Sequence, residues 1–148
     1  MAVVAVVDTN IWVSAFLNPR GFPARLVEAG EMGRLTVVLS PPMLDELMDV
    51  LCRPRIMKIR RTTAEDAEAF VRSVAEVALL VSVSGDLRLC RDPDDDVVLE
   101  TAVVGGARYV VSRDEDITRD LELTQQLADR GIEPITVSRL LELLTLDA

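Results

Sequence analysis

Val3-Val4-Ala5-Val6-Val7-Asp8-Thr9-Asn10 is the stretch of the chain that decides its fold. Five small or β-branched apolar residues run without interruption into an aspartate, a threonine and an asparagine. A continuous apolar run, unlike an alternating one, predicts a strand buried on both faces, as in the centre of a parallel sheet. Asp8 is then expected at the carboxyl end of that strand, which is where open α/β sheets bind their ligands.

Strand and helix patterns alternate along the rest of the chain. Apolar runs that predict strands lie at Leu35 to Leu39, Leu79 to Val83, Tyr109 to Ser112 and Ile135 to Val137. Segments with helical spacing of apolar residues connect them. This alternation predicts an α/β fold in which a parallel sheet carries helices on both faces. The length of 148 residues fits a single domain, 1–148, with no internal repeat or linker.

The composition narrows the chemistry that the chain can perform. It contains no histidine, which excludes Ser-His-Asp triads, Cys-His dyads and histidine-based acid–base catalysis. It also contains only one lysine. Its two cysteines, Cys52 and Cys90, are too few for a structural zinc site or a disulfide framework. Hydrolysis by this chain would therefore depend on carboxylates with a metal ion, or on the single lysine.

The chain also lacks the usual signals for export or membrane insertion. No apolar run approaches the roughly 20 residues that cross a bilayer. No basic region precedes the apolar N-terminal stretch, as it would in a secretory signal. We therefore expect a cytoplasmic protein that has no membrane partner.

Four carboxylates occupy positions that a parallel sheet brings to one edge. Asp8 and Asp114 follow predicted strands, whereas Glu46 and Asp96 lie near the starts of predicted helices. Without cations, each pair of such charges would repel by about 4 kcal/mol at roughly 4 Å and a mid-range dielectric. Carboxylate oxygens suit Mg²⁺ or Mn²⁺, and one or two such ions could activate a water and stabilise a charged phosphoryl transition state.

Simpler explanations remain open for several of these polar residues. Glu46 in a helix first turn would complement the helix dipole. Thr9 and Asn10 either form a turn or fix Asp8 and a metal-bound water. Asp116 is either a supporting acid of the site or only a helix cap.

The net charge of −9 by itself disfavours nucleic-acid binding, because phosphate contacts dominate such affinity. The charges are unevenly distributed, however, and a local field can still attract a polyanion. The candidates for holding an RNA backbone are Arg53, Arg55, Lys58, Arg60, Arg61 and Arg113. The first five form one basic run, whose alternative interpretation is a solvated loop and helix flank. Few aromatic residues are present, so base stacking is not expected to dominate recognition.

Four segments resemble PIN-domain nucleases, in the order and at the spacing of that family: Val6-Val7-Asp8-Thr9-Asn10, Leu44-Asp45-Glu46-Leu47, Arg91-Asp92-Pro93-Asp94-Asp95-Asp96 and Val111-Ser112-Arg113-Asp114-Glu115-Asp116. The resemblance covers nearly the whole chain. It is strongest to a branch of bacterial and archaeal proteins described as toxin components of toxin–antitoxin systems, related to VapC toxins.

This resemblance implies a three-layer α/β/α sandwich with a mainly parallel central sheet, commonly dimeric, that acts as an endoribonuclease with Mg²⁺ or Mn²⁺. The catalytic and metal-binding acids that it implies are Asp8, Glu46, Asp96 and Asp114, with Asp116 competing for the fourth place. Thr9 or Asn10 would be the polar helper beside the first acid, and Ser112 would match a hydroxyl residue before the fourth. RNA would be the substrate, and a cognate antitoxin and a second copy of the chain would be partners.

Two other interpretations compete with this one. An aspartyl-phosphate hydrolase would use Asp8 as its nucleophile, but Asn10 replaces the second aspartate that such enzymes carry two residues on. A PIN-fold module that binds RNA or protein without catalysis is the stronger alternative, and the presence of all four acids argues against it. The stretch of residues 117–130, before the last predicted strand, is longer than is usual for the branch. Its leucines are expected to pack on the sheet or on a partner.

Overall fold

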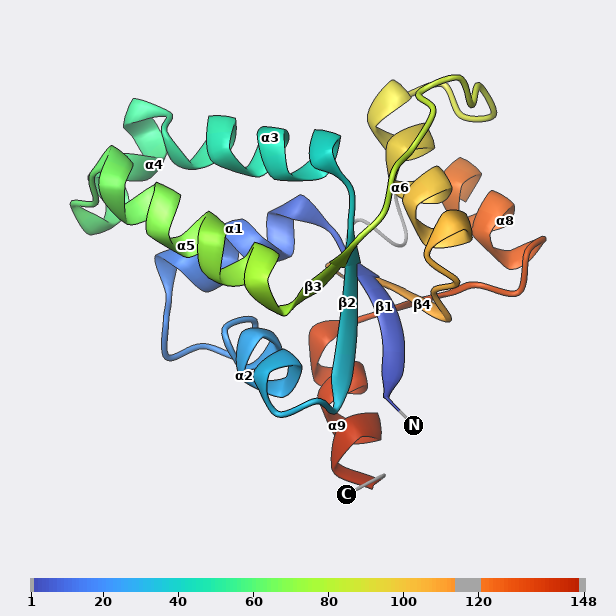
Figure 1. Ribbon diagram of the computed structural model, residues 1–148, viewed down its shortest axis with the longest axis horizontal. Helices are drawn as coiled ribbons and strands as arrows, with labels where there is room; N and C mark the ends of the chain where they lie inside the picture. The colour runs from blue at the N-terminus through green and yellow to red at the C-terminus, as the bar shows by residue number, and fades with distance from the viewer. Residues whose placement is uncertain (1, 114–120, 147–148) are drawn as a thin grey trace.

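The computed structural model describes residues 2–113 and 121–146. In this part of the chain, parallel strands form a five-stranded sheet in the order β3-β2-β1-β4-β5 (Figure 1). The strands are β1 (Val3–Val7), β2 (Leu35–Leu39), β3 (Ala78–Leu80), β4 (Tyr109–Val111) and β5 (Glu133–Ile135). The predicted α/β class with its parallel sheet is confirmed.

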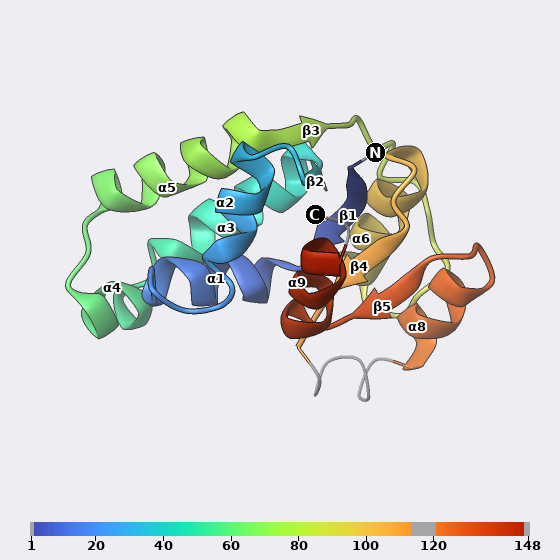
Figure 2. The ribbon, with the colours of Figure 1, turned by 90° about the horizontal axis from the view of Figure 1, so that it is seen from below.

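Helices flank the sheet on both faces. They are α1 (Thr9–Leu17), α2 (Arg25–Glu31), α3 (Pro41–Leu51), α4 (Pro54–Arg60), α5 (Ala64–Val77), α6 (Pro93–Val104), α8 (Leu121–Ala128) and α9 (Val137–Leu146). Helices α6 and α8 lie together on one side of the sheet, and α2, α5 and α9 lie on the other (Figures 1 and 2). Among the helices of residues 2–113 and 121–146, none has the length and apolar character needed to cross a membrane.

Strand β1 lies at the centre of the sheet, as its continuous apolar run predicts. Ala5, Val6 and Val7 are completely buried. Val6 is in register with Val38 of β2, while Val7 is in register with Val111 of β4. The chain builds the sheet outward from β1 in one direction through β2 and β3, then crosses over to add β4 and β5 on the other side. A crevice forms outside the carboxyl ends of the strands at such a reversal point, here between β1 and β4.

A buried hydroxyl pair joins the two helices that border this crevice. Ser40, between β2 and α3, and Thr101 of α6 are fully buried, and their hydroxyl oxygens lie 2.8 Å apart. The Thr101 hydroxyl donates its hydrogen to the Val97 carbonyl oxygen at 2.7 Å. Ser40 must therefore donate to Thr101. Close packing between α6 and β2 depends on Gly105, because a Cβ at that position would collide with Val38.

The structure adds detail to the sequence expectation for two segments, the basic run and residues 117–130. The basic run is not a loop: Pro54 opens α4, and Arg61 ends that helix in the left-handed conformation at φ 54°. Within residues 117–130, the described part forms α8, whose Leu123 and Leu127 are buried on the side facing α6 and β5. These two leucines therefore pack within the chain.

Candidate active site

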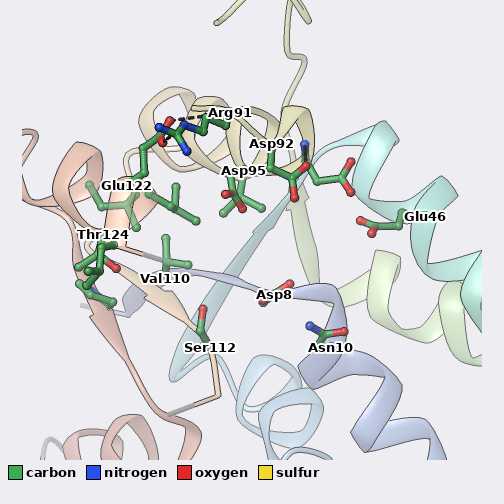
Figure 3. Close-up of a pocket in the computed structure, with 16 residues that line it drawn as sticks. Asp8, Asn10, Glu46, Arg91, Asp92, Asp95, Val110, Ser112, Glu122 and Thr124 are labelled. Atoms are coloured by element: carbon green, nitrogen blue, oxygen red, sulfur yellow. Dashed lines mark hydrogen bonds and ion pairs between the residues drawn. The ribbon is translucent and has the colours of Figure 1, made fainter. Parts of the chain in front are cut away.

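A pocket of about 560 Å³ opens at the carboxyl ends of β1 and β4, between α3, α6 and α8 (Figure 3). Most of the polar side chains in its wall are carboxylates. The charged and polar side chains that line it are Asp8, Asn10, Glu46, Arg91, Asp92, Asp94, Asp95, Ser112, Glu122 and Thr124. We call this site the acidic pocket.

Asp8 lies at the centre of the acidic pocket (Figure 3). Its backbone N–H donates to the Val111 carbonyl oxygen at 2.9 Å, so the chain leaves β1 directly beside the end of β4. Asp8 is the N-cap residue of α1, but its side chain makes no capping hydrogen bond. Ser112 follows β4 and lines the same pocket, nearly buried. Asp8 and Ser112 thus meet because their strands are neighbours in the sheet.

Glu46 reaches the pocket from α3 and is held there by Thr9. The Thr9 hydroxyl, which is buried, donates to Glu46 Oε2 at 3.2 Å. Partial burial raises the pKa of Glu46, and the neighbouring Asp94 and Asp92 raise it further, while Thr9 and Arg53 act in the opposite direction. The crowding of carboxylates in the pocket therefore already affects the protonation of Glu46. Thr9 contacts Glu46, so its role reaches beyond forming a turn after Asp8.

The N-cap and the first turn of α6 supply three more carboxylates to the pocket. Asp92 caps the helix by accepting the N–H of Asp94 at 2.9 Å. Asp94 and Asp95 follow in the first turn, and all three line the pocket.

The structure places Asp96 differently from the sequence expectation. Its side chain is 4% exposed and does not line the acidic pocket. Instead, Asp96 Oδ1 accepts the N–H groups of Leu89 at 3.0 Å and Cys90 at 2.8 Å. Within the described residues, Oδ2 is buried without a hydrogen-bond partner. In the sequence, Asp96 lies three residues before the fully buried Leu99, so both share one helix face that points into the core.

Asp95, by contrast, lies three residues before Val98, and both line the acidic pocket. Residues three apart on a helix share a face, but Val98 and Leu99 are both apolar, so the sequence alone carries no signal that separates the two neighbouring aspartates. The other two acids of the sequence hypothesis, Asp114 and Asp116, lie outside the described residues.

The sequence profile of the PIN domain matches residues 4–116 of this chain. The chain belongs to the PIN-domain family. It is also similar to "Uncharacterized protein MJ1680" of Methanocaldococcus jannaschii, with 23% identity over 112 residues, which cover 76% of this chain and 71% of the relative. PIN domains are generally nucleases, so family membership indicates nuclease activity.

The basic run of this PIN domain lies on and around α4, at the opposite end of the molecule from α6 and α8 (Figure 1). Arg53 pairs with Asp49 at 3.1 Å, and Arg60 donates to the Phe16 carbonyl oxygen at 2.7 Å. Arg55, Lys58 and Arg61 are exposed. None of these five side chains lines the acidic pocket. Arg113 is exposed directly after Ser112.

The sequence analysis did not assign Arg91 to the site, nor the pocket residues Asp92, Asp94, Asp95, Glu122 and Thr124. Arg91 lines the pocket beside Glu122 of α8, and these two residues are far apart in sequence (Figure 3). Nearby, burial raises the pKa of the Cys90 thiol to about 12, assisted by Asp96, Asp95 and Glu122. A thiol with a pKa this high stays protonated at neutral pH and is a poor nucleophile, and Cys90 does not line the pocket.

The donor set of this PIN domain suits a hard cation, because the pocket offers carboxylate, amide and hydroxyl oxygens. Over residues 2–113 and 121–146, no three acidic or cysteine side chains lie close enough together to hold a metal ion. The pocket acids that could contribute ligands are Asp8, Glu46 and Asp95, which Figure 3 shows around one hollow. The fourth acid of the sequence hypothesis belongs to the residues that are not described.

Proposed function

We propose that this PIN domain is a metal-dependent endoribonuclease that hydrolyses RNA phosphodiesters, with Asp8, Glu46 and Asp95 as metal-binding acids. The observation that carries the proposal is the acidic pocket at the reversal point of the sheet, where carboxylates from three separate chain segments line one hollow. Asp114, or Asp116 in its place, is the proposed fourth acid, since both come shortly after Ser112 in the sequence.

The described residues divide the work as follows. Asp8 and Asp95 present carboxylate oxygens from the end of β1 and the start of α6. Thr9 orients Glu46 through its hydroxyl, and Asn10 and Ser112 offer hydrogen-bonding groups at the pocket wall. When bound, Mg²⁺ or Mn²⁺ would lower the pKa of a coordinated water and stabilise the charge that develops on the phosphate. Histidine is absent from the chain, so the reaction would have to proceed without an imidazole base.

Cleavage of a single-stranded RNA with and without Mg²⁺ tests this proposal. Wild-type protein should cleave with Mg²⁺ and not in EDTA, and Asp8→Asn should lower the rate on the order of 100-fold or more. Asp45→Asn is the matched control, because Asp45 is exposed on α3 beside Glu46 but does not line the pocket. It should cleave like wild type. RNA cleavage that persists in Asp8→Asn, or in EDTA, would overturn the mechanism.

A PIN-fold module without catalysis is the second candidate. The absence of a gathered metal-ligand group among the described residues favours it. Such a module would bind RNA while the wild-type protein and Asp8→Asn both fail to cleave with any divalent cation. Cleavage by wild type alone eliminates it.

We further propose that the protein acts as a toxin of a toxin–antitoxin pair, works in the cytoplasm and forms a homodimer. The support is the similarity of the four acidic segments to the VapC-related branch. Expression of the wild-type chain should arrest growth of a bacterial host, and Asp8→Asn should not. Co-expression with the product of a small neighbouring gene should relieve the arrest if that gene encodes the antitoxin.

A further inference from the structure

The loop between β3 and α6, residues 81–92, is anchored by its backbone. Three carboxylates from neighbouring helices accept hydrogen bonds from its backbone N–H groups. Glu100 accepts the N–H of Ser84 at 2.6 Å and that of Gly85 at 3.3 Å. Asp96 accepts the N–H groups of Leu89 at 3.0 Å and Cys90 at 2.8 Å, and Glu122 accepts the N–H of Arg91 at 2.7 Å. The hydrogen bonds of Glu100 also lower its pKa, chiefly through the Ser84 N–H. The backbone at Arg91 is therefore held in place immediately before the helix that carries Asp95.

The side chain of Arg91 is much less constrained than its backbone. It is 96% exposed, and in the described part of the chain it makes no side-chain hydrogen bond. Its guanidinium approaches Glu122 no closer than 3.9 Å, between Nε and Oε2. An exposed ion pair of this length contributes little to stability. An incoming anion can therefore displace Glu122 at small cost.

Arg91 is the single cation among the described residues that line the acidic pocket. The other charged lining residues are all acidic: Asp8, Glu46, Asp92, Asp94, Asp95 and Glu122. Their charge repels a polyanion wherever no cation neutralises it. Figure 3 shows Arg91 and Glu122 on one side of the pocket and Glu46 on the opposite side. A phosphate bound by Arg91 would thus lie to one side of the acids.

We propose that Arg91 binds a backbone phosphate of the nucleic acid next to the phosphate that is cleaved, and that Glu122 competes with that phosphate for Arg91. The inference rests on the proposed nuclease function and names a residue that holds the substrate there. The guanidinium fork suits a phosphate because it can donate two parallel hydrogen bonds to it. Exchange of one carboxylate partner for a phosphate keeps Arg91 paired in both states.

Binding of a fluorescein-labelled single-stranded oligouridine, followed by anisotropy in the Asp8→Asn background with Mg²⁺, tests the role of Arg91. Arg91→Ala should weaken binding about tenfold, as expected for a lost charge-assisted contact. The affinity of Arg91→Lys should lie between that of Arg91→Ala and that of the parent protein. Glu122→Gln should strengthen binding, since it removes the competing charge but keeps an acceptor for the Arg91 N–H.

Arg88→Ala is the matched control. Arg88 belongs to the same loop and carries the same charge, but it donates to the carbonyl oxygens of Gly85 and Leu87 and does not line the pocket. It should change the affinity less than about twofold. The slope of log Kd against log salt concentration should be smaller by about 0.7 in Arg91→Ala than in the parent, and it should be unchanged in Arg88→Ala.

Equal losses in the two alanine variants, or an unchanged affinity in Arg91→Ala, would overturn the proposal. Cleavage kinetics in the otherwise wild-type chain separate it from the proposed function: Arg91→Ala should raise KM and leave kcat nearly unchanged. If the wild-type chain binds the oligonucleotide but never cleaves RNA, the nuclease proposal fails while the binding comparison still decides the role of Arg91.

Discussion

Asp95 and Asp96 are adjacent in the chain, yet their carboxylates point to different surroundings. Asp95 lines the acidic pocket, and Asp96 accepts two backbone N–H groups of the preceding loop. We predict that Asp95→Asn lowers the cleavage rate on the order of 100-fold. Asp96→Asn should retain most of the activity, because an asparagine oxygen can still accept both N–H groups.

Stability measurements complete the comparison of the two aspartates. Asp96→Ala should lower the free energy of unfolding by roughly 2 kcal/mol, since it removes hydrogen bonds to a charged acceptor. Urea unfolding of the purified variants measures this. An active Asp95→Asn protein together with a stable, inactive Asp96→Asn protein would reverse the assignment and return the third ligand to Asp96.

Glu46 gives the metal-free protein a pH dependence with a defined sign. Its pKa in the folded chain is raised above the usual value of 4.5, first by burial and then by Asp94 and Asp92. The folded chain therefore holds the Glu46 proton more tightly than the unfolded chain does. Stability is lost as the pH rises from 4.5 through the raised pKa, and it stays lower above that window.

Glu46→Gln removes this effect. In EDTA, its urea midpoint should exceed that of wild type at pH 7 and equal it at pH 4, where Glu46 is largely protonated in both states. The gain should be small, because Glu46 is only partly buried and solvent screens its charge. Asp45→Asn, on the same helix, serves as the control for general charge removal. A Glu46→Gln protein that is less stable than wild type at pH 7 would contradict the sign of the shift.

At the residue scale, Asp8 and Glu46 of the sequence hypothesis both line the acidic pocket, but the sequence could not predict how they are held. Asp8 follows from a positional rule, since strand carboxyl ends share one edge of a parallel sheet. Glu46 lies in the second turn of α3, beyond the first turn in which the sequence analysis expected it. The hydrogen bond from Thr9 to Glu46 joins residues 37 positions apart. Such a contact depends on the crossing of α1 and α3, which a single sequence does not specify.

Helices α3 and α6, which carry Glu46 and Asp95, are joined by the buried pair of Ser40 and Thr101. Thr101→Val should lower the free energy of unfolding by about 1–3 kcal/mol, because it leaves the buried Ser40 hydroxyl without its acceptor. Ser40→Ala should cost less, since Thr101 keeps its bond to Val97. The double variant should lose less free energy of unfolding than the sum of the losses in the two single variants.

A double-mutant cycle from urea unfolding measures this coupling. Additive losses would show that the two hydroxyls act independently, contrary to the geometry. Because the pair lies away from the pocket wall, the Ser40→Ala protein should also keep its RNA-cleavage rate within about threefold of wild type.

At the element scale, strand β1 could be predicted with its bounds, because its continuous apolar run has the length of a strand, is rich in β-branched residues and ends at Asp8. Helix α4 could not be predicted in this way. Proline is found both just after helices and at their first position, so the sequence around Pro54 is compatible with either, and only tertiary contacts decide between them. In the structure, Ile56 of α4 is buried while the charged residues around it are exposed, and this apolar anchor decides in favour of a helix.

The order of the strands belongs to the whole molecule and was not accessible from the sequence. Alternating patterns predict a parallel sheet, but they do not say that β1 lies between β2 and β4. That order creates the crevice in which the acidic pocket lies. It also brings α8 beside α6, so that Glu122 meets Arg91 across 31 residues of sequence. The basic run, by contrast, is carried away from the pocket by α3.

The central claim, that the carboxylates of the acidic pocket form a divalent-cation site, concerns the folded molecule as a whole. It is tested most directly by the thermal midpoint of the protein as Mg²⁺ is added. At a Mg²⁺ concentration about ten times the dissociation constant, binding stabilises the fold by about 1.4 kcal/mol. For a chain of this size, that corresponds to a rise in Tm of about 3–6 °C. We predict this rise for wild type and for Asp45→Asn, and its loss in Asp8→Asn. A Tm that does not respond to Mg²⁺ in wild type, or that responds equally in Asp8→Asn, would contradict the account.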